Sequence, residues 1–187
     1  MIILASASPR RKELLNLITD EFSVITAGID EAINISDPAE LVGTLALVKA
    51  SAVFNCGHMH DTVIGADTVV FVNGKILGKP KDEEDAKRMI ELISGRTHTV
   101  FTGVALVKEG FRDVRSAETR VTFDRLTDEE TNSYIKSKDI YDKAGAYAVQ
   151  GEAAKFISKI DGCFYNVMGL PVNVVYKMLK RAGESQA

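Results

Sequence analysis

One segment constrains the fold most strongly: residues 69–77, which read Val-Val-Phe-Val-Asn-Gly-Lys-Ile-Leu. Two apolar runs flank Asn73-Gly74, and this dipeptide supplies the positive φ angles that a type I′ turn needs at both central positions. The segment therefore predicts an antiparallel hairpin inside the chain. A preceding apolar run over residues 62–65 predicts a buried strand.

Helix starts are spaced along the rest of the chain. Capping residues followed by proline or acidic residues predict helices after Ser8, Asp37, Asp82 and Thr127, and Pro171 predicts a last helix that stops at Gly183. Strands are expected over residues 2–5, 22–27, 97–108 and 112–123, and a second hairpin over residues 156–160 and 163–167 around Asp161-Gly162. Because antiparallel hairpins are mixed with strand–helix alternation, we expect an α/β fold: a long mixed sheet, helices on its faces, and a cleft between two lobes.

Composition excludes several classes of protein. The chain has 187 residues, 45% hydrophobic and 26% charged, with a formal charge of -3, which fits a globular domain and argues against a broad nucleic-acid or membrane-binding surface. Two cysteines, Cys56 and Cys163, are too few for a disulfide framework, and both are expected to be free. No apolar run suits a signal peptide or a membrane span, so a cytoplasmic location is expected.

A local anion site is predicted at the start of the first helix. The segment Ser6-Ala7-Ser8-Pro9-Arg10-Arg11-Lys12 places three cations where the helix already carries partial positive charge. Free backbone N–H groups, two hydroxyls and two guanidinium groups together suit a phosphate. The alternative is that the cations simply point to solvent.

Other polar groups stand out against their neighbours. Asp67 follows an apolar strand, and Lys79 would reach it if the predicted hairpin ends or bulges near Gly78, since an unbroken ladder would pair Thr68 with Lys79. A surface Asp–Lys contact is the plainer alternative. Glu31 follows a predicted strand end, and Lys49 on the second helix could equally be an amphipathic surface lysine.

The segment 142–151 is rich in small residues, which would let a flat ring approach its backbone. Phosphate-loop, dinucleotide-binding and serine-hydrolase motifs are absent from the sequence. His58, His60 and His98 lack the spacing of a metal site.

Several separate motifs, in the same order along the chain, resemble those of the Maf family of nucleoside triphosphate pyrophosphatases, historically described as septum-formation proteins. The motifs are Leu4 to Arg11 with Glu13-Leu14-Leu15, Gly65 to Val70, Gly78-Lys79-Pro80, Ser94 to His98, and Asp142 to Tyr147. The match continues to Gly169-Leu170-Pro171 and implies a single Maf-like domain over residues 1–187. The resemblance also implies an elongated fold similar to that of inosine triphosphate pyrophosphatases, with the site in a central cleft.

The resemblance implies roles for individual residues. Asp67 is the expected catalytic acid and, with Glu31, the expected metal ligand. Phosphate contacts are expected from Ser6, Arg11, Glu31, Lys49 and Lys79, and base recognition from Arg10, Thr68 and Gln150. The run from Ala146 to Gly151 resembles the branch that acts on dTTP and UTP, and a Gln150 amide suits the N3–H and O4 of uracil or thymine.

The implied reaction is hydrolysis of dTTP and UTP to the nucleoside monophosphate and pyrophosphate, a nucleotide-pool function. It implies a divalent cation, most simply Mg²⁺, with Mn²⁺ or Co²⁺ as alternatives, held by carboxylates and substrate phosphates. The alternative function is a nucleotide-binding regulator of cell division without important turnover. A homodimer is compatible with the resemblance, and neither nucleic acid nor membrane is an expected partner.

Overall fold

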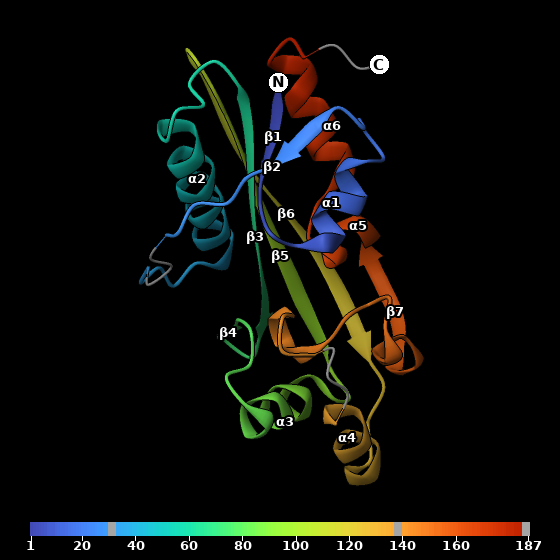
Figure 1. Cartoon of the computed structure of the whole chain (residues 1–187). Helices are drawn as coiled ribbons and strands as arrows, with labels where there is room; N and C mark the ends of the chain where they lie inside the picture. The colour runs from blue at the N-terminus through green and yellow to red at the C-terminus, as the bar shows by residue number, and fades with distance from the viewer. Residues whose placement is uncertain (30–32, 137–139, 185–187) are drawn as a thin grey trace. The chain divides into compact units, whose positions relative to one another are not determined.

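The computed structural model describes residues 1–29, 33–136 and 140–184 (Figure 1). The chain forms an α/β fold with a seven-stranded mixed sheet of order β2-β1-β3-β5-β6-β7, and β4 pairs with β3. The elements are β1 (Ile2–Ala5), α1 (Pro9–Leu15), β2 (Phe22–Val24), α2 (Pro38–Asn55), β3 (Thr62–Val72), β4 (Lys75–Leu77), α3 (Glu83–Ile93), β5 (Thr97–Lys108), β6 (Phe111–Phe123), α4 (Asp128–Ile135), η2 (Ala144–Ala146), η3 (Glu152–Phe156), β7 (Ile157–Gly162), α5 (Phe164–Met168) and α6 (Val172–Arg181).

The chain divides into two compact units. The first unit comprises Met1–Asp67, Thr102–Ala117 and Gly169–Ala187, and the second comprises Thr68–Phe101 and Glu118–Met168. The boundary falls within β3, between Asp67 and Thr68.

In the first unit, β1 lies between β2 and β3 and is parallel to both, with Ala5 opposite Gly65 (Figure 1). Ile3 and Ala5 pack with Ala46 and Ala50 of α2 in one apolar cluster. Since side chains alternate along a strand, Ile2 and Leu4 face the opposite side. All four residues of β1 are buried, which explains why this short strand is continuously apolar.

In the second unit, the predicted hairpin forms. Val72 lies opposite Lys75 and Val70 opposite Leu77, while Asn73 and Gly74 have φ angles of 50° and 74°. The helix α3 begins after Asp82, whose side chain accepts a hydrogen bond from the Asp85 N–H at 2.8 Å. The core joins apolar side chains of β3, β4, α3, β6, α4 and the segment around Tyr147, including Val70, Leu77, Met89, Ile90, Phe123 and Tyr134.

The capping predictions are confirmed. Ser8 accepts from the Arg11 N–H at 3.5 Å, and Asp37 accepts from the Glu40 N–H at 2.7 Å. Thr127 and Glu130 form the predicted capping box. These features were predictable because each depends on residues within one helical turn.

Two predictions about strands need correction. The strand over residues 22–27 is shorter than expected, since β2 ends at Val24. The hairpin over residues 156–160 and 163–167 is wrong: β7 pairs with β6, and residues 164–168 form α5. The Thr119 hydroxyl bonds both the N–H and the carbonyl of Cys163, and buried Asn166 donates to the Val100 carbonyl at 3.0 Å. These contacts with distant residues override the local strand preference.

Candidate active site

Glycines in β3 and β5 allow α2 to approach the sheet closely. A Cβ added at Gly65 would collide with the Ala46 carbonyl oxygen and would lie 2.8 Å from the Ala50 nitrogen. A Cβ added at Gly103 would similarly collide with the Val42 carbonyl. The backbone of α2 therefore lies directly against the two strands, at a distance that no side chain at either glycine would permit.

This close approach places a cation beside the predicted catalytic acid. Lys49 lies on α2, and its Nζ is 2.5 Å from Oδ1 of Asp67 on β3. Both side chains are largely buried, with exposed fractions of 16% for Lys49 and 13% for Asp67. A pair of this kind is weak evidence for stability, because removing two charges from water offsets much of their attraction. Its position at the end of an apolar run therefore points to a chemical role.

Ser6 and Arg11 form a second group in the same unit. Ser6 is buried and directly follows Ala5, whose partner on the parallel strand β3 is Gly65. An Arg11 Nη1 group donates to Ser6 Oγ at 3.2 Å, and Arg11 Nε donates to the Gly169 carbonyl at 2.9 Å. Ser6 thus leaves β1 at the carboxyl end of a parallel strand pair, which is where ligands bind in α/β sheets.

The cations of α1 have different environments. Arg10 and Arg11 are half-buried, whereas Lys12 is exposed. The plain solvent-facing alternative therefore describes Lys12 and fails for Arg11, whose guanidinium is held by Ser6 and Gly169. The pairing of Arg11 with the Gly169 carbonyl could not be predicted from the sequence, since 158 residues separate them.

The second unit holds Thr68, Lys79 and Gln150. The strand β4 ends at Leu77, so the ladder with β3 stops where Val70 lies opposite Leu77, before Lys79. A strand end near Gly78 is the condition under which Lys79 was expected to reach Asp67. Lys79 is exposed, and the preceding Gly78 carbonyl accepts from the Gly145 N–H at 3.0 Å. Gln150 is exposed.

The small-residue segment around Gly145 is packed more tightly than expected. Gly145 has a φ angle of 69°, and a Cβ there would lie 2.9 Å from a methyl group of Val70. The space at this glycine is therefore filled by Val70 and is not open to a flat ring.

The expected metal ligands can be checked only in the described part of the chain. Glu31, the predicted partner of Asp67, lies outside the described residues. Among the described residues, no three His, Cys, Asp or Glu side chains gather into a metal-binding group. His58 and His60 contact Asp61 and Glu109 at 3.1 and 3.5 Å. Cys56 and Cys163 are both free, as predicted.

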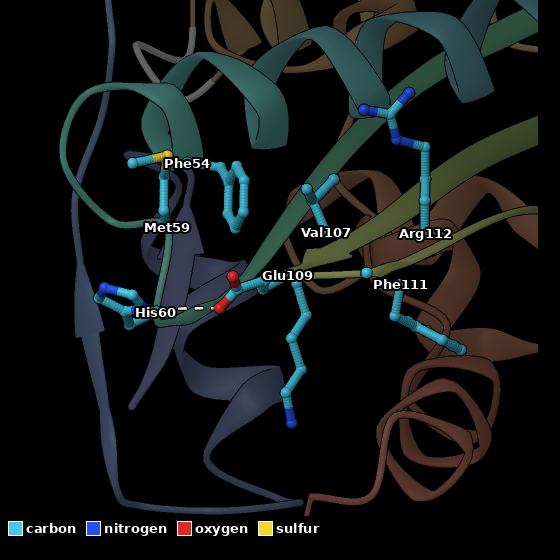
Figure 2. Close-up of a pocket in the computed structure, with 9 residues that line it drawn as sticks. Phe54, Met59, His60, Val107, Glu109, Phe111 and Arg112 are labelled. Carbon is cyan, nitrogen blue, oxygen red and sulfur yellow. Dashed lines mark ion pairs between the residues drawn. The ribbon is translucent and has the colours of Figure 1, made fainter.

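A separate hollow of about 550 Å³ lies in the first unit, near the end of α2 and the turn between β5 and β6. Figure 2 shows apolar side chains, among them Phe54, Met59 and Val107, beside the ion pair of His60 and Glu109. Of the predicted site residues that the structure describes, none lines this hollow.

The chain was compared with models of known protein families. A model of the family described as "Maf-like protein" matches residues 1–182. The chain belongs to the Maf family. The resemblance inferred from the motifs is therefore confirmed over nearly the whole chain.

This Maf chain is similar to two curated relatives named dTTP/UTP pyrophosphatase. The protein of Bacillus cereus strain AH187 is 46% identical over 183 residues, covering 96% of this chain and 94% of the relative. The protein of Bacillus cytotoxicus is 47% identical over 188 residues, covering 99% and 98%.

Solved structures confirm the expected likeness in fold. A HAM1 protein from Coxiella burnetii superposes with a TM-score of 0.56 at 14% identity, covering 96% of this Maf chain and 98% of that chain. The Ham1 protein of Staphylococcus aureus gives a TM-score of 0.50 at 15% identity, covering 65% and 71%. At these identities the likeness concerns the fold alone.

Among the described residues, no helix is both long and apolar enough to span a membrane.

Proposed function

We propose that this protein is a nucleoside triphosphate pyrophosphatase that hydrolyses dTTP and UTP between the α- and β-phosphates. The products are the nucleoside monophosphate and pyrophosphate. The activity named for the near full-length Bacillus relatives supports this assignment. The observation that carries the chemistry is the largely buried pair of Lys49 and Asp67, because it places an acid and a cation together directly after the apolar run over residues 63–66.

Asp67 is the proposed catalytic residue. Its carboxylate would orient the attacking water and accept a proton from it. Lys49 holds Oδ1 of Asp67, so the carboxylate is fixed in direction before substrate binds. The same ammonium group can also stabilise negative charge on a triphosphate that enters beside it.

Phosphate binding is assigned to Ser6, Arg11, Lys49 and Lys79, with Glu31 as a further contact. Ser6 and Gly169 hold the Arg11 guanidinium through two hydrogen bonds. Such restraint reduces the conformational entropy that the side chain would lose on binding phosphate. Phosphoryl transfer depends mainly on positioning and charge stabilisation, which these cations supply.

The donors of the chain fit a divalent cation carried by the substrate. Mg²⁺ typically binds one or two carboxylates together with substrate phosphates and water. Asp67 offers Oδ2, because its contact with Lys49 is through Oδ1, and Glu31 is the predicted second carboxylate. When bound, the cation would lower the pKa of the attacking water and neutralise phosphate charge.

Base recognition is assigned to Arg10, Thr68 and Gln150. The exposed Gln150 amide can accept from N3–H and donate to O4 of uracil or thymine. Cytosine presents an acceptor at N3 and a donor at position 4, so the same amide would have to reverse its orientation. Selectivity for uracil over cytosine therefore depends on how firmly Gln150 is held.

The experiment that tests this function is a screen of nucleoside triphosphates with Mg²⁺ and analysis of the products. Release of pyrophosphate from dTTP and UTP, with little from CTP, is the expected result. Orthophosphate release would contradict the proposed bond cleavage. Tight binding without turnover would favour the alternative, a nucleotide-binding regulator of cell division.

Three further properties are predicted for this protein from its sequence. They are a single Maf-like domain with a cleft between two lobes, a homodimer, and a cytoplasmic location.

A further inference from the structure

The motif Ser94-Gly95-Arg96-Thr97-His98 has no role in the proposed chemistry, although it is part of the family resemblance. Its first residues connect α3 to β5: Ser94 Oγ accepts from the Leu126 N–H at 2.9 Å, and the Arg96 carbonyl accepts from the Phe123 N–H at 3.0 Å. His98 lies beyond this connection, on β5, with 2% of its surface exposed. Its ring therefore needs a separate explanation.

His98 contacts a residue of the segment that carries Gln150. Its Nε2 lies 2.7 Å from the hydroxyl oxygen of Tyr147, which is also buried. The His98 ring packs edge-on against Tyr147 and beside Phe123, with centroids 5.3 and 5.5 Å apart. The contact thus combines one short hydrogen bond with a three-ring cluster inside the second unit.

The protonation of this pair is settled by burial. Burial lowers the pKa of His98 to about 4 and raises the pKa of Tyr147, so both rings are neutral near pH 7. Either the hydroxyl or the imidazole donates, and both arrangements hold the same two atoms together. The other ring nitrogen, Nδ1, is buried and has no hydrogen-bond partner among the described residues. Within the described part of the chain, the imidazole therefore bonds the Tyr147 hydroxyl through Nε2.

Tyr147 is buried and directly follows a residue with a strained backbone. Ala146, directly before it, has a φ angle of 60°, which is costly for a residue with a side chain. The Tyr134 hydroxyl donates to the Ala146 carbonyl at 3.3 Å, and Gly145 is held against Gly78. This conformation is imposed by tertiary contacts, and the His98 hydrogen bond is one of them.

Gln150 lies three residues further on, in a turn that this anchor supports. The Gly151 N–H donates to the Ala148 carbonyl at 3.1 Å, which closes the turn. Tyr147 and Val149 are buried, whereas Gln150 is exposed. The turn therefore presents the Gln150 amide to solvent from a backbone whose preceding side chains are fixed in the core.

We propose that His98 and Tyr147 are positioning residues that set where the Gln150 amide is presented, and thereby determine selectivity between uracil and cytosine nucleotides. The proposal rests on the proposed function. An amide distinguishes two bases only if its oxygen and nitrogen are held in register with them, and a displacement of about 1 Å can cost on the order of a hundredfold in rate. The pair acts through Gln150 and is not assigned a contact with substrate.

The decisive variant is Tyr147→Phe, which removes the hydroxyl and keeps the ring. We expect the ratio of kcat/KM for UTP to that for CTP to fall about tenfold, because a displaced Gln150 amide would lose about 1.4 kcal/mol of discrimination between the two bases. Tyr165→Phe is the matched control, because Tyr165 is exposed, and its ratio should equal that of the wild type. An unchanged ratio in folded Tyr147→Phe would overturn the proposal.

A second pair of measurements separates positioning from general stability. In a Gln150→Ala background, adding Tyr147→Phe should leave the UTP/CTP ratio unchanged, because the residue acts through Gln150. A further fall of the ratio in that background would contradict the mechanism. His98→Leu provides a second break of the same bond, because leucine has no hydrogen-bonding group, and should reproduce the Tyr147→Phe ratio. If both single variants unfold, the pair is purely structural and the proposal is rejected.

The failure of this inference is distinguishable from failure of the proposed function. A wild-type protein that releases no pyrophosphate from any nucleoside triphosphate would reject the function itself. If the wild type favours UTP over CTP and the folded Tyr147→Phe variant has the same UTP/CTP ratio of kcat/KM as the wild type, only the role of the pair is rejected.

Discussion

The ammonium group of Lys49 lies 2.5 Å from one carboxylate oxygen of Asp67, and both side chains are largely buried. The two residues are on different elements, α2 and β3, and their meeting depends on the small residues between those elements. Because the contact with Lys49 is made through Oδ1, the other oxygen, Oδ2, can accept from water or bind a cation. The fold thus fixes the orientation of the acid.

Asp67→Asn should abolish most turnover while the protein remains folded. The amide oxygen can still accept from Lys49, but the side chain can no longer take a proton from water. We expect kcat for dTTP to fall by about 10²–10⁴-fold, as for removal of a general base. Asp20→Asn is the matched control, since Asp20 is exposed. Near-normal dTTP turnover by Asp67→Asn with Mg²⁺ would reject the assigned role.

Arg11→Lys should weaken activity although it preserves charge. Arg11 bonds Ser6 Oγ and the Gly169 carbonyl through two separate nitrogens, and one ammonium cannot reproduce this fork. We expect kcat/KM for dTTP to fall about 10- to 100-fold, the effect of losing one charge-assisted hydrogen bond. Lys12→Ala changes an exposed cation on the same helix and should leave kcat/KM unchanged. Equal activities of the two variants would contradict the restrained geometry of Arg11.

The fold could be predicted wherever neighbouring residues determine it. The turn at Asn73-Gly74 and the caps at Ser8, Asp37 and Thr127 agree with the structure, because each depends on a few consecutive residues. The apolar positions of α3 were equally predictable, since the helical period alone places them on one face.

Long-range contacts could not be predicted in the same way. The segment 163–167 has the composition of a strand, yet Thr119 and Val100 bind it in a helical turn. For the candidate site, chemical type singled out Lys49 and Asp67, but their pairing depends on how α2 packs. One signal was available: a glycine inside an apolar strand, such as Gly65, often marks the close approach of another backbone.

Gly65→Ala should destabilise the first unit and impair activity together. The new methyl group would collide with the Ala46 carbonyl, so α2 would have to move away from β3 and carry Lys49 with it. We expect the free energy of unfolding in urea to fall by about 1–3 kcal/mol or more. We also expect kcat/KM to fall at least about tenfold at temperatures where the variant is folded.

The stability control for Gly65→Ala is Gly28→Ala. An added Cβ at Gly28 meets nothing within 4 Å, and the change should alter the free energy of unfolding by less than about 0.5 kcal/mol. Equal stability of Gly65→Ala and the wild type would show that α2 does not depend on this close approach.

Burial of His98 makes the stability of the protein depend on pH. The pKa of His98 falls from its ordinary value of 6.5 to about 4 on folding, because burial disfavours the charged imidazole. Between these values the unfolded chain binds a proton that the folded protein does not, so the free energy of unfolding rises with pH. Acidification from pH 6.5 to 4 should therefore remove on the order of 3 kcal/mol of stability through this residue.

Urea denaturation at several pH values across this range, on the wild type and on His98→Gln, measures the effect. The variant loses ring packing at every pH, so the informative quantity is the slope of the unfolding free energy against pH, which should be shallower in His98→Gln. His60→Gln is the control, because the His60 side chain is 91% exposed, and its slope should match that of the wild type. Parallel slopes for His98→Gln and the wild type would mean that His98 titrates alike in both states, which would contradict its neutral, buried pairing with Tyr147.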